Sequence, residues 1–405
     1  MTDTTATRSW RERQAADLMA SYAPALRMLV RGEGCWVWDE EGNAYLDFLG
    51  GIAVNSLGHA HPVIVEAASS QAARLVHVSN YFVTPSQLEL AERLKRITGA
   101  GEEGRVYFGN SGAEANEAAF KLARLNRRSG PSRILALNNS FHGRTMGAMA
   151  LTGKPPMREP FEPMPSGVQH IETTIEALEA AIDDSVSALI VEPIKGEAGV
   201  INLPAGFLKR ARELTERHGV LLIIDEIQTG VGRTGRWFGF QHADITPDAI
   251  TIAKGMAGGV PIGALVTFGR ASDLFSRGQH GSTFGGNPLA TAAANAVLGE
   301  IESSGLVENA AARGAQLRAL LDGPLRQVPG GSLLGELRGE GLLIGVGLTE
   351  PVGHDIYHAA LAHGLIVNAP NDSSIRIAPP LIVGDDEIAG FGERFTRALA
   401  DVAAR

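Results

Sequence analysis

The chain has 405 residues, enough for two domains or for one elaborated α/β domain. Hydrophobic residues make up 44% and charged residues 20%, as in an ordinary globular protein with a large core. The net charge of −9, with no basic run, excludes the usual electrostatic footprint of a nucleic-acid-binding protein. Glycine is enriched, at 49 residues, which indicates a site built from loops that approach a ligand closely.

A single cysteine, Cys35, excludes an internal disulfide and a Cys-rich metal site, and it suits a reducing cytoplasm. No apolar run approaches the roughly 18 residues that a membrane span needs. Residues 1–20 are rich in Thr and Arg and lack an apolar segment, so we expect an N-terminal arm rather than a signal peptide.

Residues 34–54 alternate apolar and polar side chains around a turn and predict a small antiparallel meander. Residues 61–78 carry a helical pattern. Short apolar strands then alternate with helical stretches, with strands expected at 105–112, 133–139, 187–194, 220–226, 249–255 and 263–269 and helices at 112–128, 172–183 and 204–218. This alternation predicts a mostly parallel sheet that is covered on both faces.

After about residue 310 the pattern changes to strands at 341–348, 364–370 and 374–383, with helical segments between them and a last helix from Asp385. We therefore predict an arm (1–20), a large domain (63–308) and a smaller α+β domain made from residues 21–62 and 309–405.

The segment "LLIIDEIQTGVGRTG" at 221–235 allows three interpretations. An ATPase would need a phosphate loop, but the nearest candidate, 147–156, has its glycines one residue too far apart and Pro155 in place of Ser or Thr. A dinucleotide site would need the G-x-G-x-x-G at 230–235 to end a strand and open a helix. Five residues separate it from the apolar run, and no amphipathic helix fits before Pro247.

The third interpretation rests on Asp225 and Lys254, which end two successive predicted strands. Ligands of open parallel sheets bind beyond the carboxyl ends of the strands. Pyridoxal 5'-phosphate (PLP) needs a lysine amine for its aldehyde and an acidic partner for its pyridine nitrogen. Taken alone, the two residues could equally be a helix-capping Asp and a surface Lys.

Gly112 and Ala113 follow a predicted strand and begin a helix, where backbone N–H groups bind anions such as phosphate. Ser111-x-x-Glu114 also fits a capping box, so a well-capped helix is the alternative. Residues 280–288 place further hydroxyl groups among small residues, as phosphate oxygens require.

Together with "GGIAVNSLGHAHP", "FHGRTMGAMALTG", "VEPIKGEAGV", "AKGMAGGVPIGA", "GSTFGGNP" and "IRIAPPL", these segments resemble the class III (ornithine-type) PLP-dependent aminotransferases, in order and over nearly the whole chain. The resemblance implies PLP-dependent transferase fold type I, an α/β fold. Its large domain has a mostly parallel seven-stranded sheet, and both chain ends form a small α+β domain. It also implies a homodimer whose active sites lie at the interface.

By this resemblance, Lys254 binds the cofactor aldehyde covalently and moves the proton, while Asp225 pairs with the pyridine nitrogen. Gln228 bonds the ring's phenolic oxygen, and Phe141 stacks on one ring face. The phosphate is held by Gly112 and Ala113 through backbone N–H groups and by Thr283 of the other subunit.

Arg144 and Arg376 look like the family's carboxylate binders, because Arg forks bind carboxylates bidentately. An isolated Arg after a strand could otherwise be a surface salt-bridge partner. Glu197 is expected to pair with Arg376 when the donor lacks a second carboxylate, and Ser282 to lie near the substrate. Lys195 departs from the family pattern and is expected close to the substrate side.

No metal site is expected, because His59, His61 and His77 lack a carboxylate or Cys in ligand spacing. His142 is expected to have a packing role, since Lys254 already supplies the base.

The resemblance implies a cytoplasmic, ping-pong aminotransferase that moves the δ-amino group of N2-acetyl-L-ornithine to 2-oxoglutarate, in arginine biosynthesis. Succinylornithine, N-succinyl-diaminopimelate, ornithine or 4-aminobutyrate are alternative donors. A PLP-dependent isomerase and a non-catalytic relative remain as alternatives, and we expect neither a nucleic-acid nor a membrane partner.

Overall fold

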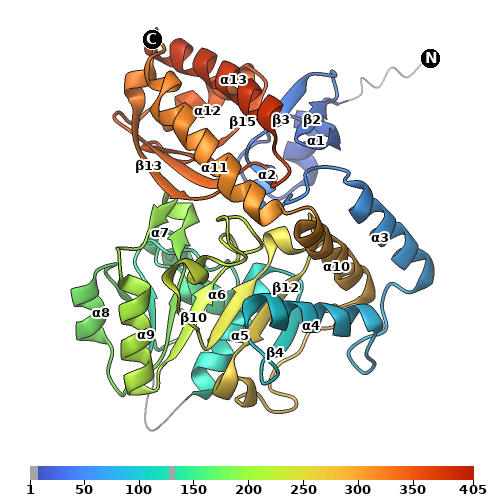
Figure 1. Cartoon of the computed structure of the whole chain (residues 1–405), viewed down its shortest axis with the longest axis vertical. Helices are drawn as coiled ribbons and strands as arrows, with labels where there is room; N and C mark the ends of the chain where they lie inside the picture. The colour runs from blue at the N-terminus through green and yellow to red at the C-terminus, as the bar shows by residue number, and fades with distance from the viewer. Residues whose placement is uncertain (1–7, 127–132) are drawn as a thin grey trace.

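The computed structural model describes residues 8–126 and 133–405. A seven-stranded sheet in the order β4-β12-β11-β10-β7-β5-β6 runs through the lower half of the molecule (Figure 1). Its strands are β4 (Arg105–Gly109), β5 (Arg133–Leu137), β6 (Val168–Ile171), β7 (Val186–Val191), β10 (Leu221–Asp225), β11 (Ala249–Ile252) and β12 (Gly263–Thr267). Only β12 runs antiparallel to its neighbours, so the predicted mostly parallel sheet is confirmed. The edge strand β6 escaped prediction because it is short and only partly apolar.

Helices cover both faces of this sheet. Successive strand residues point to opposite faces, so Leu221 and Ile223 join the apolar cluster of α5 while Leu222 and Ile224 join that of α9. The helices of this half are α3 (Pro62–Arg74), α4 (Pro85–Thr98), α5 (Gly112–Leu125), α6 (Met146–Leu151), α7 (Pro155–Arg158), α8 (Ile175–Ala181), α9 (Phe207–His218) and α10 (Pro288–Ser303). The three predicted helices are confirmed, although residues 127–128 of the first lie outside the described residues.

The two chain ends fold together in the upper half of Figure 1. The antiparallel strands β2 (Trp36–Asp39) and β3 (Ala44–Asp47) confirm the predicted meander, whereas its further strand, β1 (Leu29–Glu33), precedes the predicted range. β15 (Leu365–Ile366) adds to this sheet parallel to β3. A second sheet contains β13 (Leu334–Glu340), β14 (Leu343–Leu348), β17 (Ser374–Ile377) and β16 (Asn368–Asn371), with α11 (Leu306–Asp322), α12 (Gly353–Ala362) and α13 (Asp385–Ala403) beside it. The predicted α+β fold from both ends is confirmed.

The strand predicted at 374–383 is wrong beyond Ile377. Pro379 and Pro380 follow, and proline cannot donate a ladder hydrogen bond. The remaining elements are short: α1 (Trp10–Asp17), α2 (Gly50–Ala53), the hairpin β8 (Ile194–Lys195) with β9 (Ile201–Asn202), and 3-10 helices at Glu159–Phe161, Gly196–Ala198, Gly239–Ala243, Lys254–Met256, Gly269–Asp273, Pro324–Arg326 and Gly331–Leu333.

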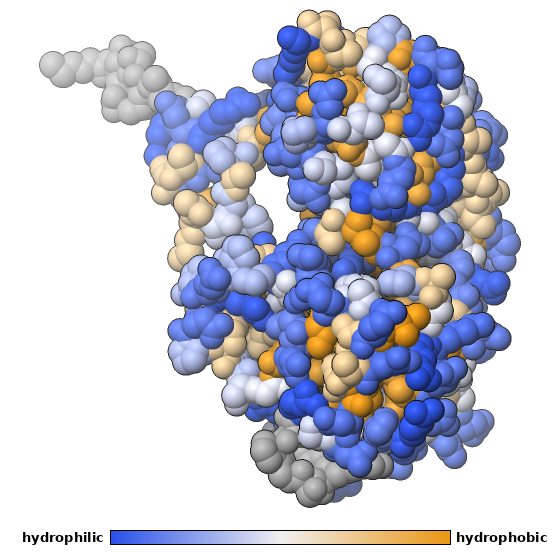
Figure 2. Space-filling model, turned by 90° about the vertical axis from the view of Figure 1, so that its left-hand side faces the viewer, coloured by the Kyte–Doolittle hydropathy of each residue, from blue (hydrophilic) through white to orange (hydrophobic). Residues whose placement is uncertain are grey.

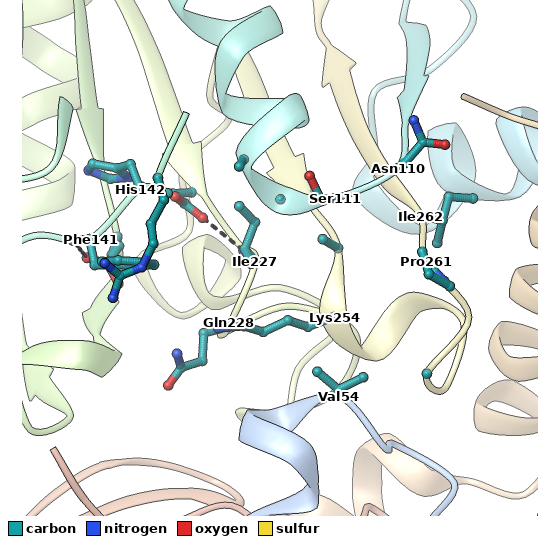
Figure 3. Close-up of a pocket in the computed structure, with 18 of the residues that line it drawn as sticks. Val54, Asn110, Ser111, Phe141, His142, Ile227, Gln228, Lys254, Pro261 and Ile262 are labelled. Carbon is teal, nitrogen blue, oxygen red and sulfur yellow. Dashed lines mark hydrogen bonds and ion pairs between the residues drawn. The ribbon is translucent and has the colours of Figure 1, made fainter. Parts of the chain in front are cut away.

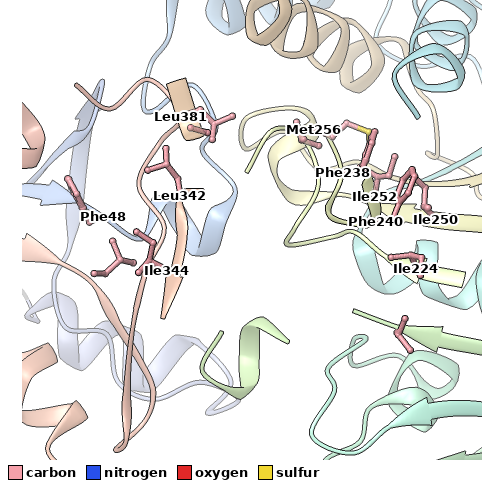
Figure 4. Close-up of a cluster of buried hydrophobic side chains, with 14 of the residues drawn as sticks. Phe48, Ile224, Phe238, Phe240, Ile250, Ile252, Met256, Leu342, Ile344 and Leu381 are labelled. Carbon is pink, nitrogen blue, oxygen red and sulfur yellow. The ribbon is translucent and has the colours of Figure 1, made fainter. Parts of the chain in front are cut away.

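One apolar cluster joins the large sheet to the unit built from the chain ends; Figure 4 shows side chains from both sides of it. The Gly-rich segment at 230–235 lies at this junction and forms turns rather than opening a helix, which agrees with rejecting a dinucleotide site. A Cβ on Gly235 would lie 2.9 Å from that of Ala311, so the glycine allows close approach of α11.

Among residues 8–126 and 133–405, no group of three or more His, Cys, Asp or Glu side chains that could hold a metal ion occurs. His59 pairs with Asp47 at 2.8 Å, and His77 packs against the ring of Phe284. Across residues 8–126 and 133–405, no helix is long and apolar enough to cross a membrane.

Candidate active site

A cavity of about 400 Å³ lies beyond the carboxyl ends of β10 and β11 (Figure 3). Strand ends and helix starts from several parts of the chain converge on it. Of the predicted site residues, it is lined by Gly112, Ala113, Phe141, Arg144, Asp225, Gln228 and Lys254. The convergence follows from the parallel sheet, in which successive strands end at the same edge.

At one end of the cavity, which we call the Asp225 end (Asn116, His142 and Asp225), the carboxylate of Asp225 is 3% exposed. Its Oδ2 accepts hydrogen bonds from Asn116 Nδ2 at 2.8 Å and His142 Nδ1 at 2.7 Å, and Oδ1 accepts from the backbone N–H of Ile227 at 3.0 Å. A buried carboxylate so held is fixed in direction and keeps lone pairs for a donor in the cavity.

His142 is therefore more than a packing residue, and that expectation is wrong. Burial by itself lowers the pKa of His142, but its hydrogen bond to Asp225 and the charge of that carboxylate outweigh burial and raise the pKa. The sequence could not show this contact, because the two residues are 83 positions apart.

Lys254 begins a 3-10 helix directly after β11, with a φ of 40°. Such a φ is strained for a residue with a side chain, and strain of this kind clusters at functional sites. Burial lowers the pKa of Lys254, although the charge of Glu197 opposes the shift. Within the described part of the chain, its Nζ makes no hydrogen bond or ion pair, so the amine is available to a ligand.

The start of α5 faces the same cavity. Ser111 Oγ accepts from the backbone N–H of Glu114 at 3.2 Å, so half of the expected capping box is present. The carboxylate of Glu114 instead accepts from the backbone N–H of Asn110 at 3.0 Å. No acceptor among the described residues faces the N–H groups of Gly112 and Ala113, which leaves them to an anion.

Around Gln228, which lines the cavity, lies a second group that we call the Arg376 end (Glu197, Gln228 and Arg376). Arg376, 2% exposed, forms an ion pair with Glu197 and donates to Gln228 Oε1 at 3.1 Å and Asn368 Oδ1 at 2.8 Å. The Glu197 side chain keeps 28% of its surface exposed. Arg376 and Glu197 do not line the cavity itself; they lie behind Gln228, which does.

Ser282 and Thr283 lie outside the cavity. Ser282 Oγ accepts from Nδ2 of the cavity residue Asn110 at 3.1 Å, whereas Thr283 is exposed beside a separate small recess. Lys195 does not line the cavity, and its expected position close to the substrate side stays a prediction. It is buried, and its Nζ donates to Asn138 O and Thr173 Oγ1, away from the cavity.

Glu192 lines the cavity but was not among the predicted residues. Its carboxylate accepts from the backbone N–H of Phe141 at 2.9 Å, next to the Asp225 end. Burial raises its pKa to about 7, although the charge of His142 opposes the rise. A signal was present in the sequence, because Glu192 directly follows the buried strand β7, which ends at Val191, as Asp225 ends the buried strand β10.

This donor set fits PLP. The cavity offers a free lysine amine for an aldehyde, a buried carboxylate for a pyridinium N–H, and unpaired helix N–H groups for a phosphate. Phe141, which lies beside His142 in Figure 3, adds an aromatic ring to the lining of the cavity. Each of these groups matches one part of the cofactor.

Known proteins agree with this assignment. The sequence model described as "Aminotransferase class-III" matches residues 18–399. The chain is 49% identical to acetylornithine aminotransferase of Streptomyces coelicolor, over 94% of this chain and 92% of that protein. It is 47% identical to acetylornithine aminotransferase of Mycobacterium tuberculosis, over 96% of this chain and 95% of that protein.

Solved structures agree as well. Ornithine aminotransferase from Toxoplasma gondii superposes with a TM-score of 0.92 at 33% identity, covering 98% of this chain and 95% of that one. Acetylornithine aminotransferase from Elizabethkingia anophelis superposes with a TM-score of 0.85 at 31% identity, covering 97% and 98%. With the family match over nearly the whole length and a cavity suited to its cofactor, this chain belongs to the class III aminotransferases, which are PLP-dependent enzymes.

Proposed function

We propose that the protein moves the δ-amino group of N2-acetyl-L-ornithine to 2-oxoglutarate, giving N-acetyl-L-glutamate 5-semialdehyde and L-glutamate. The observation that carries the choice of donor is the similarity to acetylornithine aminotransferases at 47–49% identity over more than nine-tenths of the chain. The ornithine aminotransferase of similar fold is only 33% identical.

The Arg376 end suits the two unlike substrates of this reaction. The reacting carbon of 2-oxoglutarate carries a carboxylate, whereas the reacting δ-carbon of acetylornithine carries none. A guanidinium that binds the acceptor would therefore be left unpaired when the donor is bound, which is costly for a buried charge. Glu197 would neutralise Arg376 in the donor half-reaction. In the acceptor half-reaction the carboxylate of 2-oxoglutarate would replace Glu197 on Arg376. Arg144 at the cavity rim would take the distal carboxylate of either substrate.

Bound PLP supplies an electron-withdrawing ring that stabilises negative charge on the reacting carbon. The Nζ of Lys254 would bind the aldehyde carbon of the cofactor, and Asp225 would pair with the pyridine nitrogen of the cofactor. The backbone N–H groups of Gly112 and Ala113 would bind the phosphate of the cofactor. The amine of Lys254, with a pKa lowered by burial, then moves the proton at the reacting carbon. Gln228 would orient the ring's oxygen and Phe141 would cover one face.

We also propose a homodimer in which Thr283 completes the phosphate site of the other subunit. Large apolar side chains near it are exposed, with Tyr81 at 94%, Phe82 at 67% and Phe284 at 60%. Residues 18–22, in the part of the chain that follows the grey atoms on the left of Figure 2, expose further ones, including Tyr22 at 87%. Such apolar patches mark interaction surfaces. Light scattering would measure the molar mass of the protein in solution, and the mass of a monomer would refute the proposed homodimer.

The donor is tested by measuring glutamate formation from 2-oxoglutarate with acetylornithine, succinylornithine, N-succinyl-diaminopimelate, ornithine and 4-aminobutyrate. We expect the highest kcat/KM for acetylornithine. A poor rank for acetylornithine would refute the substrate while leaving the class intact. Turnover without 2-oxoglutarate would indicate an isomerase. The cytoplasmic location stays a prediction.

A further inference from the structure

Lys154 carries a positive charge close to those of Arg376 and Arg144. The proposed reaction gives Lys154 no role. Lys154 lies between α6 and α7 and is half-buried, outside the residues that line the cavity. Its Nζ donates a hydrogen bond to the backbone carbonyl oxygen of Glu197 at 2.7 Å. That carbonyl belongs to the residue whose carboxylate pairs with Arg376.

The backbone fixes Lys154 in this place. Gly153 donates to Ser140 O at 3.1 Å and accepts from the N–H of Asn139 at 2.8 Å. A Cβ on Gly153 would lie 2.1 Å from the carbonyl oxygen of Leu137, so only glycine allows this approach. Lys154 is thereby held against the segment that leads into Phe141.

The ammonium group of Lys154 has unused hydrogen-bond donors and no carboxylate partner among the described residues. Burial lowers the pKa of Lys154; the carboxylates of Glu197 and Glu192 oppose this, and the charges of Arg376 and Arg144 add to it. No carboxylate within the described residues lies at ion-pair distance from its Nζ. An ammonium has three donors, and the carbonyl of Glu197 takes one.

We propose that Lys154 is a positioning residue for Glu197: it holds the Gly196–Ala198 turn through the Glu197 carbonyl and receives the Glu197 carboxylate when a dicarboxylate acceptor takes its place on Arg376. The inference rests on the proposed function, since it requires Glu197 and the acceptor to alternate on Arg376.

The physical reason is the cost of a carboxylate that loses its partner at a partly buried position. The Glu197 side chain has 28% of its surface exposed, so water alone would solvate it incompletely. Because the Lys154 ammonium already contacts the carbonyl oxygen of Glu197, a change of the Glu197 rotamer can bring its carboxylate to that ammonium without a shift of the backbone. A cation at this place lowers the free energy of the state in which Glu197 has left Arg376, and it thereby favours binding of the acceptor to Arg376.

The test uses the holoenzyme and glutarate, an unreactive dicarboxylate that replaces the acceptor. For Lys154→Met we expect calorimetry to show glutarate affinity about three- to tenfold weaker, and the KM for 2-oxoglutarate to rise similarly. The single-turnover reaction with the amino donor should change less than about twofold. Lys154→Arg should restore glutarate binding. Lys121→Met is the matched control, because Lys121 also donates to a carbonyl, that of Gln279, but on the exposed side of α5.

A double-mutant cycle then separates positioning from a direct charge effect. In a Glu197→Gln background no carboxylate needs a second partner, so Lys154→Met should weaken glutarate binding by a clearly smaller factor, and the remainder comes from the lost hydrogen bond to the backbone carbonyl at position 197. An equal penalty in both backgrounds, or no penalty in either, overturns the inference. If Arg376→Gln leaves glutarate binding unchanged, the acceptor site itself is wrong. If Arg376→Gln abolishes glutarate binding but Lys154→Met binds glutarate fully, only the role of Lys154 is wrong. Melting temperatures confirm that each variant is folded.

Discussion

The Asp225 end and the Arg376 end bind charge in opposite ways. Asp225 accepts from Asn116, His142 and a backbone N–H, all within the large sheet unit, and its side chain is nearly inaccessible. Arg376 belongs to β17 in the other unit and pairs with the partly exposed carboxylate of Glu197. A permanent partner of the cofactor is thus held by buried, neutralising hydrogen bonds, whereas a partner of the substrate needs a counterion that can leave.

The largest effect is expected at Lys254. Lys254→Ala removes the covalent link to the cofactor and the proton-transfer group together, so activity should fall by at least about 10³-fold. The visible absorbance of the lysine-bound cofactor should disappear. Lys195→Met is the matched control, because that lysine is also buried but bonds outside the cavity. Persistent lysine-dependent absorbance in Lys254→Ala would assign the link to another residue.

Asp225→Asn tests whether Asp225 acts on the cofactor in both half-reactions. The amide keeps the size of the side chain but loses the charge that keeps the pyridine nitrogen protonated. We expect both half-reactions to slow by about 10²- to 10³-fold, measured separately by stopped-flow absorbance. A loss confined to one half-reaction would contradict a role in cofactor electronics and would remove the contrast between the two ends.

Arg376→Lys tests the exchangeable end. Lysine keeps the charge but cannot form a bidentate pair, so kcat/KM for 2-oxoglutarate should fall by about 30-fold, or about 2 kcal/mol. The donor half-reaction should change much less. Arg212→Lys is the control, since Arg212 pairs with Asp248 at 2.8 Å away from the cavity. Equal losses in both half-reactions would show that Arg376 does not discriminate the substrates.

The smallest effect is a pH dependence of stability at His142. Because the folded-state pKa of His142 is raised, its stabilising contribution is complete below the unfolded-state pKa, about 6.5, and is lost as the pH rises through the folded value. His142→Asn can still donate to Asp225 but cannot become charged. Melting temperatures of the cofactor-free protein should therefore differ more from the native value at pH 6 than at pH 9. An equal difference at both pH values would contradict a charged His142.

Strand patterns predicted much of the cofactor site, because a buried strand is recognised from local sequence and parallel strands end at one edge. That reasoning located Asp225 and Lys254, and it applies equally to Glu192. It could not locate Asn116 or His142, whose contacts with Asp225 join residues 109 and 83 positions apart. Nor could it show that Lys195 turns away, since the direction of a side chain at the end of a strand depends on its neighbours.

Local sequence patterns were enough to predict the alternation of strands and helices, the family, and the residue types that meet the cofactor. These follow from hydrophobic periodicity and turn chemistry, which act over a few residues. The pairing of the charges, by contrast, depends on the packing of elements that are distant in the sequence. Arg376 and Glu197 lie 179 positions apart and meet because the chain-end unit docks on the large sheet. Lys154 meets the Glu197 carbonyl because Gly153 lets two backbone segments touch. Such contacts depend on how separate elements pack, and no local pattern encodes them.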